Sequence, residues 1–191
     1  MPPDCVAVVL LAAGRSMRFG EGDKLLAAYR GKPLYRHAAE TIAALPFAHR
    51  IAVVRVADRA GAIHAGLAAL GLTLLVNDAP ETGLASSLVL AIAHVADLDC
   101  SGVLICLADM PAVPADHLIR LCETAQDISS IVASTDGVTP SPPAFIGRAH
   151  FDALLALRGD KGARDLLERG MMIAADGRLL RDVDLPADLD G

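Results

Sequence analysis

The chain has 191 residues, of which 53% are hydrophobic and 21% are charged, and its formal net charge is -6. This length suits one domain with a full core, so we expect residues 1–191 to form a single domain. The composition excludes general disorder. The acidic balance argues against a broad surface for nucleic acid or for an anionic membrane, because such surfaces neutralise phosphates with lysine and arginine.

The N-terminus and the cysteines bear on where the protein works. Residues 1–14 have no basic region ahead of a short apolar run, which argues against a signal peptide. No stretch reaches the roughly 18 uncharged apolar residues that a membrane span needs. The four cysteines form no CxxC pair, and we expect them to be small core residues in a reducing compartment: Cys5, Cys100, Cys106 and Cys122. These features predict a cytoplasmic protein.

Short apolar runs alternate with helical patterns along the first two thirds of the chain. The expected strands lie at 5–12, 50–56, 72–76 and 102–108, and the expected helices at 33–45, 58–71, 83–96 and 114–125. Short strands between longer helices indicate βαβ units, and such units form a mainly parallel sheet that is covered on both faces. The fold class is therefore predicted to be α/β.

The last third is less regular. We expect a strand at 129–135, an extended proline-rich segment at 136–147, helices at 148–157 and 159–170, and a last strand at 179–186. No linker or charge run separates this part from the rest. We therefore expect it to return to the same sheet.

The segment after the first strand, "LAAGRSMRFGEGDK" at 11–24, is a glycine-bearing loop that fits neither common phosphate-binding template. A P-loop needs a hydroxyl residue after its lysine, and here Lys24 is followed by Leu25. The loop instead carries three cations, Arg15, Arg18 and Lys24, which suit a triphosphate or a pyrophosphate. Judged on charge alone, a solvated turn explains them equally well.

A carboxylate ends a later apolar strand. Asp109 follows "LICLA", at what should be the carboxyl edge of the same parallel sheet, where it could hold Mg²⁺ against phosphate oxygens. Taken alone, an aspartate before Met-Pro such as Asp109 is more typical of a turn or of a helix N-cap than of a metal ligand, but its pairing with the cationic loop reverses that order. Asp182 and Asp184 alternate along an extended segment, so one of the two could supply a second metal carboxylate.

Six segments in order, "LAAGRSMRFGEGDKLL", "TGLASSL", "LADMP", "PPAF", "GDKGARDLL" and "DVDLPADL", resemble the MobA-like nucleotidyltransferases. Within that group the likeness is to the molybdenum cofactor cytidylyltransferases. The resemblance implies a Rossmann-like three-layer fold with a mainly parallel sheet. It also implies an NTP substrate, Mg²⁺, and attack by a substrate phosphate on the α-phosphate with release of pyrophosphate.

The resemblance also implies roles for individual residues. The base and ribose side would be lined by Leu11, Ala12, Ala13 and Gly14, and a second nucleotide segment would comprise Gly83, Ser86 and Ser87. The triphosphate would be held by Arg15, Arg18 and Lys24, with Arg15, Lys24 and Asp109 as the catalytic residues. Asp109 and Asp184 would hold the metal. The acceptor would meet Lys161 and Arg164, unless these two cations are simply solvated.

The likeness predicts both substrates. The motif reads "LAAG" where guanylyltransferases usually read LAGG, which favours CTP over GTP. The expected acceptor is the molybdopterin cofactor. Two departures leave the acceptor open: "TPSPPAF" replaces the usual Gly-His- or Gly-Asn-Pro-type segment, and Leu185 stands where threonine is common. The alternatives are transfer from GTP or to another phosphorylated small molecule, and a non-catalytic nucleotide-binding accessory of a molybdenum hydroxylase.

Overall fold

The computed structural model describes residues 1–14, 19, 22–56, 61–79, 84–159 and 163–190. Within these residues a seven-stranded sheet has the order β5-β4-β1-β6-β8-β7-β9. Its strands are β1 (Val6–Leu11), β4 (His49–Arg55), β5 (Thr73–Asn77), β6 (Gly102–Leu107), β7 (Ile131–Thr135), β8 (Pro140–Gly147) and β9 (Met171–Ala174). All neighbouring pairs are parallel except those of β8, which runs antiparallel to β6 and β7. The predicted α/β class with a mainly parallel sheet is confirmed.

Strand β1 lies inside the sheet, and its sequence, VAVVLL, suits this position because it is apolar throughout. All six residues are buried, and β4 and β6 pair with β1 on its two sides. Alternate side chains enter different cores: Val6, Val8 and Leu10 face one apolar cluster, and Ala7, Val9 and Leu11 face the other.

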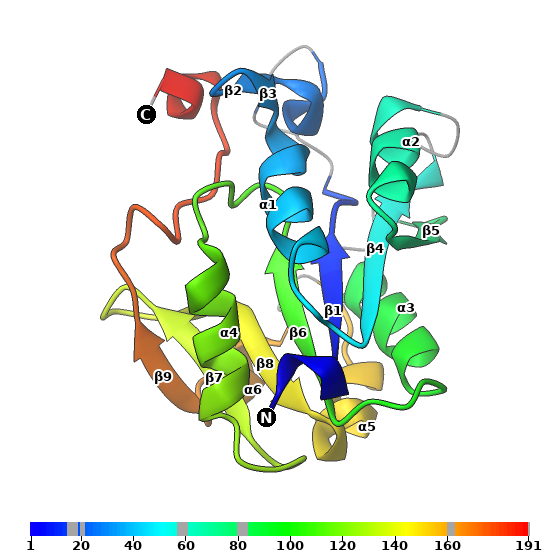
Figure 1. Ribbon diagram of the computed structural model, residues 1–191, viewed down its shortest axis with the longest axis vertical. Helices are drawn as coiled ribbons and strands as arrows, with labels where there is room; N and C mark the ends of the chain where they lie inside the picture. The colour runs from blue at the N-terminus through cyan, green and yellow to red at the C-terminus, as the bar shows by residue number, and fades with distance from the viewer. Residues whose placement is uncertain (15–18, 20–21, 57–60, 80–83, 160–162, 191) are drawn as a thin grey trace.

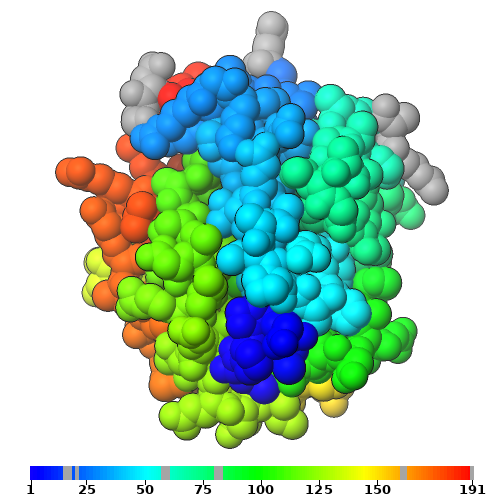
Figure 2. Space-filling model, in the orientation of Figure 1, coloured from blue at the N-terminus to red at the C-terminus, as the bar shows by residue number. Residues whose placement is uncertain are grey.

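Helices cover both faces of the sheet, which gives three layers (Figure 1). One face is covered by α1 (Leu34–Ala43), α2 (Ala62–Ala69) and α4 (Ala115–Thr124), whose apolar residues join the same cluster as Val8. The other face is covered by α3 (Leu84–Val95), α5 (Phe151–Leu155) and α6 (Arg164–Leu167). The space-filling view shows α1, α2 and α4 closing over the sheet on the near side (Figure 2).

Several short elements gather at the edge where β1, β4 and β6 end, at the top of Figure 1. They are the 3-10 turn η2 (Lys24–Leu26), the hairpin of β2 (Ala28–Tyr29) and β3 (Lys32–Pro33), and the C-terminal turn η6 (Pro186–Asp190), which contacts β2. Two more 3-10 turns, η1 (Pro3–Cys5) and η5 (Arg148–His150), lie elsewhere. The carboxyl edge is the usual place for ligands in such sheets.

Two sequence predictions are wrong. The segment 179–186 is not a strand, and the edge strand is β9 at Met171–Ala174. The backbone of this segment is engaged elsewhere: the Val183 N–H donates to the Asp109 carbonyl at 2.9 Å, and the N–H of Leu185 donates to the Asp188 carboxylate at 2.8 Å. Cys5 is exposed, since it lies in the turn ahead of β1, whereas the other three cysteines are buried.

In the part of the chain that the structure describes, we find no helix with the length and apolar character required to cross a membrane.

Candidate active site

Lys24 is positioned by the short 3-10 turn η2, which follows the opening loop. The Asp23 side chain caps this turn by accepting a hydrogen bond from the Leu25 N–H at 3.0 Å. Leu25 is buried in the core beneath and anchors the turn. Lys24 is itself only 6% exposed, so the solvated alternative does not hold for this cation.

The Lys24 ammonium group lies between two carboxylates that are distant in sequence. Its Nζ is 2.7 Å from Asp109 Oδ2 and 3.0 Å from Asp184 Oδ1. Burial lowers the pKa of Lys24, but the charge of Asp109 and the hydrogen bonds to both carboxylates outweigh it, so the pKa lies above its usual 10.5. Lys24 is therefore a fixed cation that neutralises an acidic cluster.

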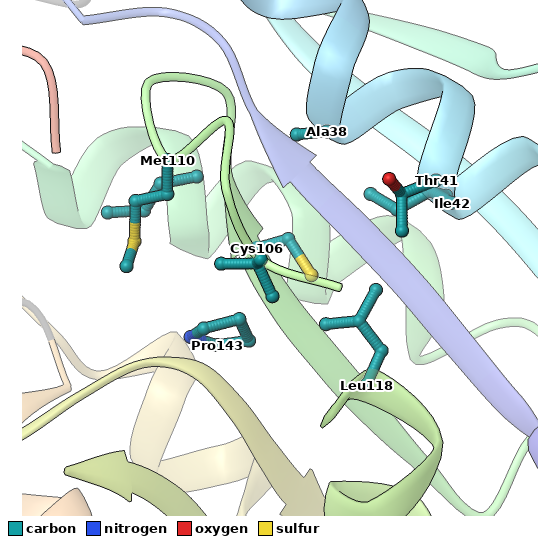
Figure 3. A pocket seen from close by; sticks show the side chains of 9 residues that line it. Ala38, Thr41, Ile42, Cys106, Met110, Leu118 and Pro143 are labelled. Atoms are coloured by element: carbon teal, nitrogen blue, oxygen red, sulfur yellow. The ribbon is translucent and has the colours of Figure 1, made fainter. Parts of the chain in front are cut away.

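Asp109 is held by the turn that ends β6. The Ala108 N–H donates to the Leu11 carbonyl at 3.1 Å, which ties this turn to the end of β1. The next side chain, Met110, is buried beside Cys106 and Pro143 around a cavity of about 10 Å³ (Figure 3). A cavity of this size holds about one water molecule, so it cannot take a substrate.

The C-terminal segment brings Asp184 to the same place. Asp188 fixes it by accepting the Asp184 N–H at 3.1 Å, and Asp188 also pairs with Arg181. Of the alternating pair, Asp184 contacts Lys24 and Asp182 lies nearby. Asp182 is exposed by its surface area, but partial desolvation by its neighbours and the charges of Asp184 and Asp109 raise its pKa.

This donor set fits a divalent cation. Mg²⁺ prefers hard oxygen ligands and is commonly bound by one or two carboxylates together with substrate phosphates. Asp109 and Asp184 already share one cation, the Lys24 ammonium group, and their side chains are 21% and 36% exposed. The two carboxylates therefore converge on a common point that solvent can reach.

The start of the opening loop lies against the neighbouring strand. The Ala12 N–H donates to the Val53 carbonyl at 2.9 Å, and both Ala12 and Ala13 are buried while Gly14 is exposed. Leu11 is the last residue of β1. Four predicted site residues lie outside the described residues: Arg15, Arg18, Gly83 and Lys161.

Asn77, which the sequence reasoning missed, holds the predicted second nucleotide segment. This buried residue ends β5, and its amide group donates at 2.9 Å to the hydroxyl groups of both Ser86 and Ser87 in the first turn of α3. Its oxygen accepts the Ala79 N–H at 2.9 Å. A polar residue closing an apolar strand at the carboxyl edge is the signal that could have revealed it.

Arg164 lies at a larger cavity of about 240 Å³. Most of the lining is apolar, from Leu11, Leu107, α3, β8 and α6, and residues 139–142, "TPSP", form part of the wall. Helix α6 is one turn long, so its dipole adds little, and Arg164 is a 61%-exposed side chain paired with Glu168. The structure does not bring Arg164 into contact with the Lys24 cluster.

Comparison with known proteins identifies the family. The MobA-like NTP transferase domain matches residues 8–175. The chain belongs to this family. Purine catabolism protein PucB of Bacillus subtilis (strain 168) is 28% identical over 199 residues, which cover 95% of this chain and 93% of PucB. Nicotine blue oxidoreductase of Paenarthrobacter nicotinovorans is 32% identical over 178 residues, which cover 86% of this chain and 82% of that protein.

Solved structures share the fold over almost the whole chain. The crystal structure of Rv0371c from Mycobacterium tuberculosis H37Rv has a TM-score of 0.83 and 28% identity, and the match covers 97% of this chain and 96% of that one. A complex of Rv0371c with manganese has a TM-score of 0.73 and 25% identity, with 97% and 93% of the two chains covered. The Rossmann-like NTP transferase fold implied by the sequence is thus confirmed.

Proposed function

We propose that this NTP transferase family member moves CMP from CTP to the molybdopterin cofactor, with release of pyrophosphate and with Mg²⁺ as its metal. The observation that carries the proposal is the contact of Lys24 with Asp109 and Asp184 at the carboxyl edge of β1 and β6. This arrangement supplies a buried cation and two metal-type carboxylates where α/β sheets bind nucleotides.

The reaction needs placement and charge neutralisation more than a side-chain nucleophile. An oxygen of the acceptor phosphate forms a bond to the α-phosphorus of CTP, while the bond from that phosphorus to the β-phosphate oxygen breaks and pyrophosphate leaves. Asp109 and Asp184 would hold the metal, which when bound supplies positive charge against the triphosphate. The Lys24 ammonium group can exchange a carboxylate for a phosphate oxygen, and so neutralise charge that gathers on the leaving group.

Ala13 supports CTP as the donor. In guanylyltransferase relatives a glycine usually occupies this position, whereas here a buried methyl group borders the loop that leads to Gly14. We infer that the methyl group leaves less room for a purine than a glycine would. The variant Ala13→Gly is therefore expected to raise activity with GTP relative to CTP.

The cavity of about 240 Å³ is the proposed acceptor site, with Arg164 available for an anionic group. A second candidate function is transfer to a different phosphorylated acceptor. It is favoured by the cavity wall itself, where Pro140, Ser141 and Pro142 replace the segment usual in the cytidylyltransferases. A wall with few hydrogen-bonding side chains selects a less polar ring than one lined by histidine or asparagine.

A donor and acceptor screen tests both candidates. Purified protein is incubated with CTP, GTP, ATP or UTP, with Mg²⁺ or Mn²⁺, and with either molybdopterin cofactor or another phosphorylated small molecule as acceptor, and the products are identified by mass. The proposal predicts a cytidylylated pterin and pyrophosphate, both lost in Asp109→Asn. Turnover of CTP with another acceptor supports the second candidate, whereas tight NTP binding without any pyrophosphate release contradicts both.

A further inference from the structure

The ion pair of Arg55 with Asp23 lies beside the Lys24 cluster, because Asp23 immediately precedes Lys24 in the chain. Arg55 is the last residue of β4, the neighbour of β1 in the sheet. Asp23 immediately precedes Lys24 and uses its two oxygens for different partners: one accepts the Leu25 N–H, and the other accepts from the Arg55 guanidinium group. The two side chains are only 17% and 16% exposed.

The ion pair connects the short turn η2 to strand β4 of the central sheet. Turn η2 has three residues, and one turn of 3-10 helix has no stability of its own, so its position depends on its contacts. Arg55 fixes the turn on the β4 side, and Lys24 reaches Asp109 beyond the end of β6 on the other side. The turn thus spans the end of β1, and the ion pair of Arg55 with Asp23 fixes the backbone position from which the Lys24 side chain extends.

The pair also removes a charge. Asp23, Asp109, Asp182 and Asp184 lie around a site proposed to receive a triphosphate. Without Arg55, the Asp23 carboxylate would be a mostly buried anion without its ion-pair partner, one residue from the cation that has to meet phosphates. A polyanionic ligand would then be repelled by a group that wild-type protein neutralises.

We propose that Arg55 is a positioning residue for nucleotide binding, which acts through Asp23 on Lys24 and neutralises Asp23 toward the triphosphate. This inference rests on the proposed function, because it assumes that the Lys24 cluster binds an NTP. It assigns Arg55 no contact with substrate.

Two single variants and their combination separate the effect of the ion pair on the position of Lys24 from its effect on the charge of Asp23. Arg55→Met removes both the contact that positions the turn and the charge that neutralises Asp23. Asp23→Asn removes the ion pair but keeps an oxygen for the Leu25 N–H, and it leaves no surplus anion. The double variant, which combines Arg55→Met with Asp23→Asn, also lacks the ion pair but has no unneutralised carboxylate at position 23. Arg55→Lys keeps the charge without the planar fork, and Arg36→Met, which breaks a surface pair with Glu40 on α1, is the matched control.

Binding of CTP, GTP and inorganic tripolyphosphate is measured by calorimetry with Mn²⁺ and without acceptor. The expected affinity order is wild type, then Asp23→Asn and the double variant together, then Arg55→Met, which should bind about tenfold more weakly than wild type. Arg55→Lys should recover part of the loss, and Arg36→Met should match wild type. In turnover assays the KM of the nucleotide should rise while the KM of the acceptor stays unchanged.

The possible negative results distinguish failure of the proposed function from failure of the role assigned to Arg55. Wild-type protein that binds none of the three ligands refutes the proposed function and the inference with it. Wild-type binding combined with an unchanged Arg55→Met, or with a double variant weaker than Arg55→Met, refutes the inference alone. Should Arg55→Met prove unfolded by circular dichroism, Asp23→Asn and Arg55→Lys decide: full wild-type affinity in both refutes the role of Arg55, and weakened binding in both supports it.

Discussion

Replacing Lys24 by methionine is the most informative single perturbation of the site. Methionine keeps an unbranched apolar stem of similar length and removes the charge. The change leaves Asp109 and Asp184 close together with no cation between them. Wild-type protein should therefore be more stable than the variant, even though the site is built for function.

The magnitude follows from the exposure of the partners. Removing one member of a buried ion pair costs about 3–5 kcal/mol, because the remaining charge is left unpaired. Asp184 is 36% exposed and Asp109 is 21% exposed, so water can hydrate both carboxylates and part of that cost is recovered. We expect the free energy of unfolding to fall by about 2–3 kcal/mol.

The assay is urea unfolding near neutral pH, followed by circular dichroism. Lys32→Met is the matched control, since Lys32 pairs with Glu40 in a more exposed pair and should change stability by less than about 1 kcal/mol. Added Mn²⁺ should stabilise Lys24→Met more than wild type, because a divalent cation can take the position between the carboxylates. A variant as stable as wild type, or one that Mn²⁺ does not favour, would refute the account of Lys24 as a neutralising cation.

The pH dependence of the same pair of proteins has a defined sign. The pKa of Lys24 is raised in the folded protein, so the stability that it contributes is fully present below about 10.5 and is lost as the pH rises through the higher folded value. The difference in stability between wild type and Lys24→Met should therefore shrink only in strongly alkaline solution. A difference that already disappears near pH 8 would contradict this assignment.

Three further outcomes are expected. Asn77→Ala should raise the KM for nucleotide about tenfold, with little change in the KM for acceptor, because two serine hydroxyl groups lose their shared donor; equal changes in both constants would count against this. Gly147→Ala should destabilise the fold by about 2 kcal/mol or more in urea unfolding, because a Cβ there would lie 2.1 Å from the Ile128 carbonyl oxygen; a wild-type midpoint would contradict the packing. Burial lowers the pKa of His117, which contacts Ser134, so its contribution should be present above about pH 6.5 and be lost as the pH falls. The stability gap between wild type and His117→Gln should shrink as the pH falls below about 6.5, and a constant gap would refute this.

The sequence was sufficient for the part of the fold that depends on local pattern. The buried run at Val6–Leu11 and the alternation of such runs with helices predict a covered parallel sheet, and the structure has one. The carboxyl-edge rule also brings the opening loop and Asp109 to the same place, and Lys24 contacts Asp109.

Other features depend on contacts that no local pattern encodes. The strand predicted at 179–186 is absent because its backbone bonds to the Asp109 turn and to Asp188, although Asp184 still reaches Lys24. The sequence places Arg55 near the end of an apolar strand, but its ion pair with Asp23, 32 positions away, can be seen only in the structure. Such long-range polar contacts are decided by the packed fold and not by periodicity.

The central claim is that the Lys24 cluster serves nucleotidyl transfer from CTP. Its most direct test is mass analysis of the products formed from CTP, Mg²⁺ and molybdopterin cofactor by wild-type protein and by Asp109→Asn. The account predicts a cytidylylated cofactor and pyrophosphate with wild type and neither with the variant. Unchanged product formation by Asp109→Asn, or a wild type that binds CTP and releases no pyrophosphate with any acceptor, would contradict it.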